Sequence, residues 1–338
     1  MAEPAHKIFI DRYTNWNLVK ERLDHYENIS KFYSLDYLQS CSNKAPFYCH
    51  YLGWRLGTWE SEELFRFFDA LLANAVKLPN WKKDRIPQGC EFENFWSFVW
   101  ELQVAQLFAS YPNTSLEWTN SGPDLKVGSK AGEFFVECTI YRKSFGLEEF
   151  INELLDHIHP WIDAKHVPFN IFSLPKDKDV GSFLDTLFRP LLDEKFLQEK
   201  IREAAQISPV ILPTPEGVEN LYVFIENDNA KDSSPNRPWI ATGSPEDSLE
   251  VIVKEVLDNK RESNGLKSHR PNLLAANLLL GQDYQLATAL RTIPTPDLGA
   301  EFDAVFLTAC GIDAIPSLNN NRLIYFYDSH PIKGFLNQ

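Results

Sequence analysis

The chain has 338 residues, of which 44% are hydrophobic, 13% aromatic and 24% charged, and its formal net charge is −14. This length suits one large or two ordinary domains, and this composition can fill a core, which speaks against a disordered chain. No segment approaches the roughly 20 apolar residues of a membrane-spanning helix, and Met1–Pro4 lacks the character of a signal peptide. We therefore expect a soluble, cytoplasmic protein with no membrane association.

The charge is unevenly distributed along the chain. Residues 1–90 carry 12 basic and 11 acidic side chains, whereas residues 91–338 carry 21 and 36. Overall acidity opposes nucleic-acid binding through net charge, so a polyanion would need a local basic patch. Lys82-Lys83-Asp84-Arg85 and the basic positions between Lys254 and Arg270 are candidates, although charge runs are usually solvated surface.

The cysteines argue against two kinds of cross-link. They are odd in number and include no Cys-x-x-Cys pair, which excludes a regular disulfide framework and a thiolate zinc site. We expect reduced, mostly buried thiols at Cys41, Cys49, Cys90, Cys138 and Cys310.

The first 88 residues are aromatic-rich and are predicted to be mainly helical. The clearest helix covers Ser61–Leu72, which has acidic residues in its first turn and apolar residues at helical spacing. Residues 79–89 form a polar connection with two prolines and a glycine, so we place a boundary there, with an α/β domain over residues 89–338. Five tryptophans could stack bases, although this density is more typical of a core: Trp54, Trp59, Trp81, Trp96 and Trp100.

Residues 91–110 are apolar nearly all the way round, which indicates a buried helix, and Glu101 lies in its middle. A carboxylate rarely occupies such a position without a partner. Strands are predicted next near Leu116–Val127 and Phe134–Tyr141, joined by a turn at residues 128–132. Alternating side chains of the second strand would point to opposite faces, of which one is apolar and faces inward. The other face would carry Glu133, Phe135, Glu137, Thr139 and Tyr141.

The rest of the chain alternates between helices and strands. A helical insertion is predicted at about residues 146–206, followed by a strand at 221–226 and a helix at 245–262. Further strands are expected near residues 273–280, 304–308 and 323–327, which together indicate an α/β sheet covered by helices. Within the insertion, His157-x-His159 and His166 have the composition of a zinc site but lack its spacing.

Two carboxylates form the most specific pattern in the chain. Asp124, in Ser121-Gly122-Pro123-Asp124-Leu125-Lys126-Val127, stands thirteen residues before Glu137. A hairpin would bring both carboxylates to one end of one sheet face. Mg²⁺ takes one or two carboxylates, waters and phosphate oxygens, and it can generate hydroxide and offset charge on a phosphate.

This pattern resembles the PD-(D/E)XK nuclease superfamily, whose fold is restriction-endonuclease-like. Pro123-Asp124 matches the family's Pro-Asp, Glu137-Cys138-Thr139 takes the place of (D/E)-x-K, and Glu101 falls where many members carry an acidic residue on the first core helix. The resemblance has motif support over residues 90–143. It implies an α/β fold with a central mixed sheet flanked by helices, and coordination of Mg²⁺ or Mn²⁺ by Asp124 and Glu137, assisted by Glu101.

One departure from the family concerns its lysine. Thr139 stands in that place, and a threonine cannot supply a cation to orient water or stabilise developing charge. Lys126, Lys143 and Lys260 could compensate, and we prefer Lys126 because it lies two positions after Asp124, on the same face of its strand. Glu-x-Thr could equally mark a protein that kept the fold and lost the reaction.

The sequence thus favours a magnesium-dependent endonuclease acting on nucleic acid, DNA rather than RNA, as a homodimer or with a partner protein. Its expected catalytic residues are Asp124, Glu137, Lys126, Glu101 and Thr139. The alternative hypothesis is a catalytically inactive protein of the same fold that binds nucleic acid or protein. A third, an unrelated α/β domain, predicts that Asp124 and Glu137 lie more than ~10 Å apart, too far to share one ion.

Overall fold

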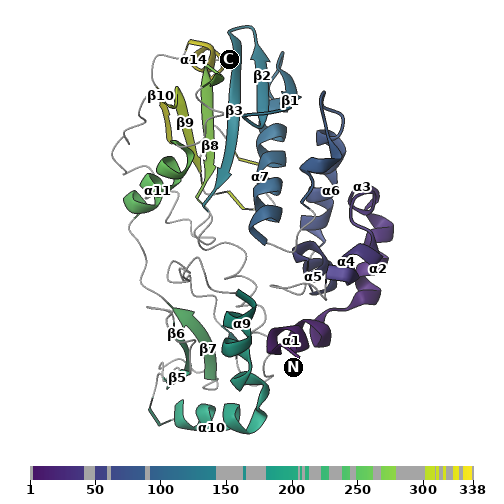
Figure 1. Cartoon of the computed structure of the whole chain (residues 1–338), viewed down its shortest axis with the longest axis vertical. Coiled ribbons are helices and arrows are strands. Elements are labelled where there is room, and N and C mark those ends of the chain that lie inside the picture. Colours follow the sequence, from purple (N-terminus) through teal and green to yellow (C-terminus); the bar gives the residue numbers. More distant parts are fainter. Residues whose placement is uncertain are drawn as a thin grey trace, which may run out of the picture.

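The computed structural model describes residues 3–41, 50–58, 62–87, 92–141, 163–164, 180–204, 206–207, 210–212, 222–227, 238–243, 249–261, 268–278, 301–308, 310–311, 315–316, 323–326 and 330–336. The protein is an α/β protein in which a mixed sheet carries helices on its faces and an N-terminal helical region packs beside it (Figure 1). No helix within these ranges is both long and apolar enough to cross a membrane.

The N-terminal region is helical, as predicted. Its elements are α1 (Ala5–Tyr13), α2 (Trp16–His25), α3 (Glu27–Ser30), α4 (Leu35–Cys41), α5 (Tyr51–Thr58), α6 (Glu63–Ala75) and the 3₁₀ turn η1 (Lys83–Arg85). Helix α6 buries Leu64, Phe68 and Leu71 at helical spacing, and the Asp69 carboxylate accepts the amide hydrogen of Asn28 at the start of α3. The buried side chains of this region belong to the same hydrophobic cluster as those of the sheet.

A six-stranded mixed sheet forms the centre of the described α/β region. In spatial order its strands are β1 (Ser115–Trp118), β2 (Leu125–Ser129), β3 (Gly132–Ile140), β8 (Asn272–Asn277), β9 (Ala304–Thr308) and β10 (Leu323–Phe326). The neighbours β3, β8 and β9 are parallel, and the remaining pairs are antiparallel. The single strand predicted over residues 116–127 is in fact β1 and β2, because the Gly122-Pro123 turn interrupts it.

Helices cover both faces of this sheet. Helix α7 (Phe92–Ala109) lies on the face that carries Val136 and Cys138, and its Trp100 donates a hydrogen bond to the Ala275 carbonyl. Helix α11 (Leu249–Arg261) packs its apolar side chains on the opposite face, which includes Leu274. This two-sided cover explains why β8 and β9 are buried along their whole length.

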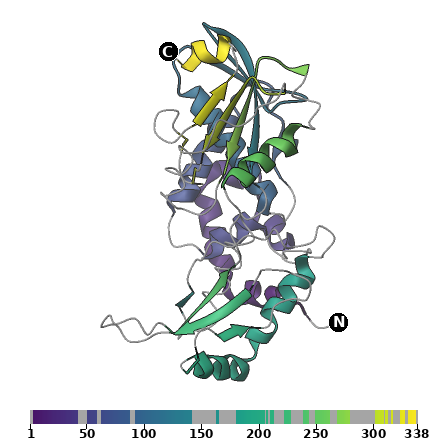
Figure 2. The same ribbon diagram turned by 90° about the vertical axis from the view of Figure 1, so that its left-hand side faces the viewer.

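A second, four-stranded sheet lies at the other end of the molecule (Figures 1 and 2). Its strands are, in order, β4 (Asp163–Ala164), β7 (Pro238–Gly243), β6 (Tyr222–Asn227) and β5 (Val210–Leu212), and α9 (Val180–Phe188), η3 (Pro190–Leu192) and α10 (Glu194–Ala204) accompany it. Helices α9 and α10 fall within the predicted helical insertion, but strand β4, which pairs with β7, also falls there and was not predicted. The strand predicted at 221–226 belongs to this second sheet, which the sequence analysis did not separate from the first.

Candidate functional site

The open end of the β2–β3 hairpin brings Asp124 beside Glu137. The antiparallel register ends with Leu125 opposite Val136, so Asp124 lies one residue beyond the last pair. There the Asp124 Oδ2 accepts the amide hydrogen of Cys138 at 2.8 Å. Strand β3 runs on beside β8, with Glu137 paired to Leu274. The predicted hairpin is confirmed. Because the Asp124 carboxylate contacts Cys138, the residue next to Glu137, the wide separation of Asp124 and Glu137 that an unrelated α/β domain predicts is contradicted.

A tight turn between β1 and β2 delivers Asp124 to this position. The Thr119 amide donates to the Asp124 carbonyl at 3.1 Å, and the Thr119 hydroxyl donates to the Pro123 carbonyl. Gly122 adopts φ +85°, a left-handed conformation that favours glycine, and the His269 ring lies against it. The Gly-Pro-Asp sequence therefore fixes the backbone from which the carboxylate projects.

Lys260, at the end of α11, is the lysine that meets this hairpin. Its Nζ lies 2.5 Å from the Glu137 Oε1, and the two side chains are only 19% and 12% exposed. Thr139 follows two residues after Glu137, on the same face of β3, and it is buried. Strand β3 has threonine, not lysine, at position 139, and Lys260 of α11 supplies a positive charge on that face of the sheet.

The lysine preferred from the sequence lies elsewhere on the hairpin. The Lys126 Nζ is 2.9 Å from the Glu133 Oε2 and 3.6 Å from the Glu117 Oε1, on the antiparallel part of the sheet. Its charge is therefore directed to these two carboxylates, whereas Lys260 contacts Glu137 directly. Lys143, the third candidate, falls outside the described residues.

Glu101 approaches the site from α7 and is paired with an arginine. The Arg85 Nη1 lies 3.8 Å from the Glu101 Oε2, and the same guanidinium donates to the Thr119 carbonyl and lies 4.8 Å from the centre of the Trp118 ring. Arg85 therefore connects the helix that carries Glu101 with the turn that carries Asp124. From the sequence, Arg85 was a candidate phosphate contact or solvated surface charge within Lys82-Lys83-Asp84-Arg85, with no predicted link to Glu101.

Burial and a neighbouring carboxylate raise the pKa values of two acidic groups at this site. Burial, followed by the charge of Glu137, raises the pKa of Asp124 to about 7, against the opposing hydrogen bond from Cys138. Burial and the charge of Asp124 likewise hold the pKa of Glu101 well above its usual range, and Arg85 opposes this. The pKa of the Cys138 thiol is also raised by burial and by these carboxylates. The site thus holds excess negative potential.

Two of these carboxylates fit a hard cation. Asp124 and Glu137 offer the oxygen ligands that Mg²⁺ or Mn²⁺ prefers, and a cation would relieve the repulsion that raises the pKa of Asp124. Within the described ranges, no three or more His, Cys, Asp or Glu side chains form a ready-made metal cluster. Any ion would therefore need water or phosphate oxygens to complete its shell, as Mg²⁺ commonly does.

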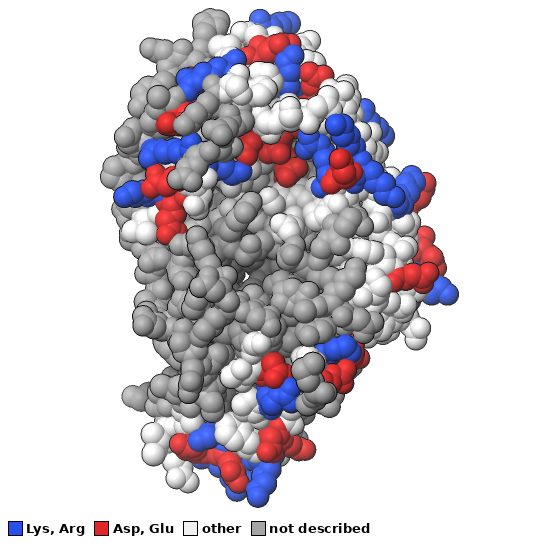
Figure 3. Space-filling model, viewed as in Figure 1, with Lys and Arg blue, Asp and Glu red and all other residues white. Residues whose placement is uncertain are grey.

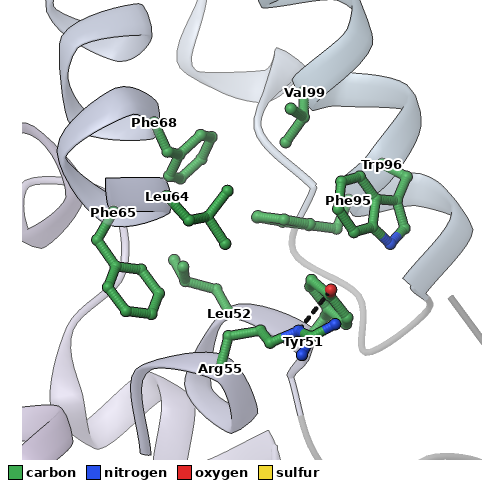
Figure 4. Close-up of a pocket in the computed structure, with 9 residues that line it drawn as sticks. All are labelled: Tyr51, Leu52, Arg55, Leu64, Phe65, Phe68, Phe95, Trp96 and Val99. Atoms are coloured by element: carbon green, nitrogen blue, oxygen red, sulfur yellow. Dashed lines mark hydrogen bonds between the residues drawn. The ribbon is translucent and has the colours of Figure 1, made fainter. Parts of the chain in front are cut away.

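Other candidates from the sequence fall into the core or outside the described residues. Trp54, Trp96 and Trp100 are buried and Trp81 is partly buried against the core, while Trp59 and the His157–His166 cluster are not described. A small pocket between α5, α6 and α7 is lined almost entirely by apolar side chains (Figure 4). Of the cysteines, Cys41, Cys138 and Cys310 are reduced and buried, as expected, and the other two are not described.

Charged side chains also group on the surface near this end of the molecule. Figure 3 shows acidic side chains in the half that holds the six-stranded sheet, with Lys and Arg side chains on both sides of them. An anionic centre with a cationic border suits a ligand that carries both a metal ion and phosphates.

Comparison of the chain with models of known protein families, with curated proteins and with solved structures found no significant match. The functional interpretation therefore rests on the geometry of the candidate site.

Proposed function

We propose that this protein is a metal-dependent nuclease of restriction-endonuclease-like fold that hydrolyses phosphodiester bonds in nucleic acid, DNA rather than RNA. The observation that carries the proposal is the meeting of Asp124, Glu137 and Lys260 at one end of a hairpin. A carboxylate pair at the open end of a hairpin in an α/β sheet, with a lysine from a helix that covers the sheet, supplies the groups that metal-assisted phosphodiester hydrolysis needs.

Each residue has a distinct role in the proposed reaction. Asp124 and Glu137 would hold Mg²⁺ or Mn²⁺, which when bound supplies a nucleophilic hydroxide and neutralises charge on the phosphate. Lys260 orients the attacking water and stabilises the negative charge that develops on the phosphate, in place of a lysine at position 139. Glu101, held by Arg85, supports the site from the α7 side, and buried Thr139 keeps the strand face compact.

A second function is favoured by one observation. The Lys260 ammonium lies 2.5 Å from the Glu137 carboxylate, so in this arrangement the lysine itself neutralises a proposed metal ligand. A protein in which that ion pair is permanent would keep the fold and bind nucleic acid or protein without cleaving anything. The two functions differ in whether a divalent cation displaces the lysine from Glu137.

Cleavage assays test the first function. We expect the full chain to cut supercoiled plasmid, single-stranded DNA or structured RNA in Mg²⁺ or Mn²⁺, with DNA cut faster. Asp124→Asn and Glu137→Gln should each lower the rate by about 10³-fold or more, because each removes a metal ligand. Glu133→Gln is the matched control, since Glu133 lies on the same strand face but pairs with Lys126; its rate should stay within about threefold. Retention of cleavage in the first two variants would refute this site.

Calorimetry separates the two functions. The nuclease proposal expects measurable heat on titration of Mn²⁺ into the wild type and none in Asp124→Asn. The binding-module alternative expects no metal-dependent heat in either protein and unaltered nucleic-acid or protein binding in Asp124→Asn.

A further inference from the structure

The chain between α6 and α7 runs along the edge of the candidate site. We call residues 79–85 the edge segment. The Trp118 backbone amide donates to the Pro79 carbonyl at 3.0 Å, and the side-chain Nδ2 of Asn80 donates to the Glu117 Oε2 at 3.3 Å, which joins the segment to edge strand β1. Trp81 packs on Trp118 with ring centres 5.6 Å apart. The segment is thus fixed on the strand that precedes the Asp124 turn.

Arg85 ties the other end of the edge segment directly to the site. Its guanidinium donates to the Thr119 carbonyl, in the turn before Asp124, and lies 3.8 Å from the Glu101 carboxylate. Any side chain that projects outward from the edge segment is therefore held at a defined place near the proposed metal ligands.

Two exposed lysines of the edge segment form no ion pair with the part of the chain that the structure describes. Lys82 and Lys83 are exposed, and their ammonium groups form no ion pair with any residue that the structure describes. Lys126 and Lys260, by contrast, are both committed to carboxylates. The stretch from Lys77 to Arg85 contains four basic residues and one acidic residue in a chain of net charge −14. The net charge of this stretch is therefore positive, whereas that of the whole chain is negative.

We propose that Lys82 and Lys83 contact the phosphate backbone of the nucleic acid whose scissile phosphate lies at Asp124 and Glu137. This inference rests on the proposed function for the identity of its ligand. Lysine is a point charge without the planar fork of arginine, so these contacts position the strand and carry no base sequence. They also explain how an acidic protein holds a polyanion, because the edge segment supplies positive charge where the site supplies negative charge.

The test measures nucleic-acid affinity as a function of salt in the absence of cleavage. The full chain carrying Asp124→Asn is titrated with a labelled DNA duplex and with a single strand, in EDTA, between 50 and 200 mM KCl. The test variant adds K82Q and K83Q. The control adds K20Q and K195Q, which remove two exposed lysines on α2 and α10 that form no ion pair with any described residue.

The expected result is a change in the salt slope. Each lost phosphate contact lowers the slope of log K against log salt by about 0.9 for a duplex and about 0.7 for a single strand. We expect K82Q/K83Q to lower the slope by about 1.8 for the duplex and by about 1.4 for the single strand, and to weaken binding at 0.1 M salt roughly tenfold or more. K20Q/K195Q should leave the slope and the affinity unchanged.

The outcomes separate this inference from the nuclease proposal. An unchanged slope in K82Q/K83Q, an equal change in K20Q/K195Q, or no nucleic-acid binding at all would overturn it, even if the wild type cleaves DNA. A reduced slope specific to K82Q/K83Q supports it even if the wild type cleaves nothing, in which case only the nuclease proposal fails.

Discussion

Charged side chains are buried both in the N-terminal helical region and at the open end of the β2–β3 hairpin, but the two regions treat them differently. In the helical region, Arg55 is fully buried, donates to the Tyr51 hydroxyl at 2.6 Å and lies 5.0 Å from the Tyr51 ring (Figure 4). Arg22 donates to the Leu56 carbonyl and lies 5.1 Å from the Phe65 ring. Each cation meets acceptors and aromatic faces that attract it.

At the hairpin, by contrast, carboxylates lie close together, and burial and a neighbouring carboxylate charge raise the pKa values of Asp124 and Glu101. Lys260 and Arg85 offset part of this charge, but the pKa of Asp124 still rises to about 7. Buried charge that meets an acceptor and an aromatic face is attracted by its surroundings, whereas buried charge beside like charge costs stability and is a sign of a functional site.

The largest effect is expected at Lys260. Lys260→Met should lower the rate of nucleic-acid cleavage by about 10²- to 10³-fold, the usual loss when one charge-stabilising donor is removed from an active site. Lys126→Met is the control, because Lys126 pairs with Glu133 and Glu117, and it should change the rate by less than about threefold. A larger loss in Lys126→Met than in Lys260→Met would return the catalytic role to the lysine preferred from the sequence.

A large loss of stability is expected in the helical region. Arg55→Ala should lower the free energy of unfolding by about 3 kcal/mol, since it removes a buried hydrogen bond, a cation–π contact and the packing of the side-chain stem. Arg66→Ala, on the exposed side of α6, should cost less than about 0.5 kcal/mol. Urea unfolding monitored by tryptophan fluorescence measures both, and equal values would mean that Arg55 is not held as the contacts indicate.

At Asp124 we expect a substitution to raise the free energy of unfolding, whereas Arg55→Ala lowers it. Because the folded pKa of about 7 exceeds the unfolded value of 3.8, the folded state prefers the protonated acid. Its unfavourable contribution is absent below the unfolded pKa, grows as the pH rises between the two values, and is complete above pH 7. Asp124→Asn should therefore raise the free energy of unfolding by up to about 4 kcal/mol at pH 8, and this gain should shrink towards zero near pH 4. A gain in the free energy of unfolding that does not depend on pH, or a loss, would contradict an unfavourable buried charge at Asp124.

Local patterns predicted most of what surrounds the carboxylates. Alternation and turn residues gave the hairpin with Asp124 at its start and Glu137 on β3, and continuous apolarity gave α7 with Glu101. The partner of Glu137 could not be found this way, because Lys260 lies 123 residues further along the chain and no local period links them. Same-face spacing favoured Lys126 instead, but β1 and the turn end of β3 supply Glu117 and Glu133 to that lysine.

Long-range pairing also explains the features that the sequence analysis missed. Strand β6 looks like any other buried strand in sequence, and only its antiparallel partners β5 and β7 assign it to a second sheet. Arg85 looked like surface charge, because the Trp118 ring and the Thr119 carbonyl that receive it belong to a segment more than 30 residues away. The residue types were visible in the sequence, whereas their partners required the fold.

The smallest effect is expected at two glycines, one at each end of the β2–β3 hairpin. Gly122, before Asp124, has φ +85° and would place an added Cβ 2.9 Å from His269, and Gly132, at the β2–β3 turn, has φ +122° and would place it 3.3 Å from Pro331. Alanine at either position should cost about 1–2 kcal/mol of stability, because both glycines adopt left-handed conformations. Only Gly122→Ala should also lower the cleavage rate, by about tenfold, since it displaces the turn that aims Asp124 whereas Gly132 lies at the far end. Equal rates in the two variants, at equal stability, would show that the open end of the hairpin is not where the chemistry occurs.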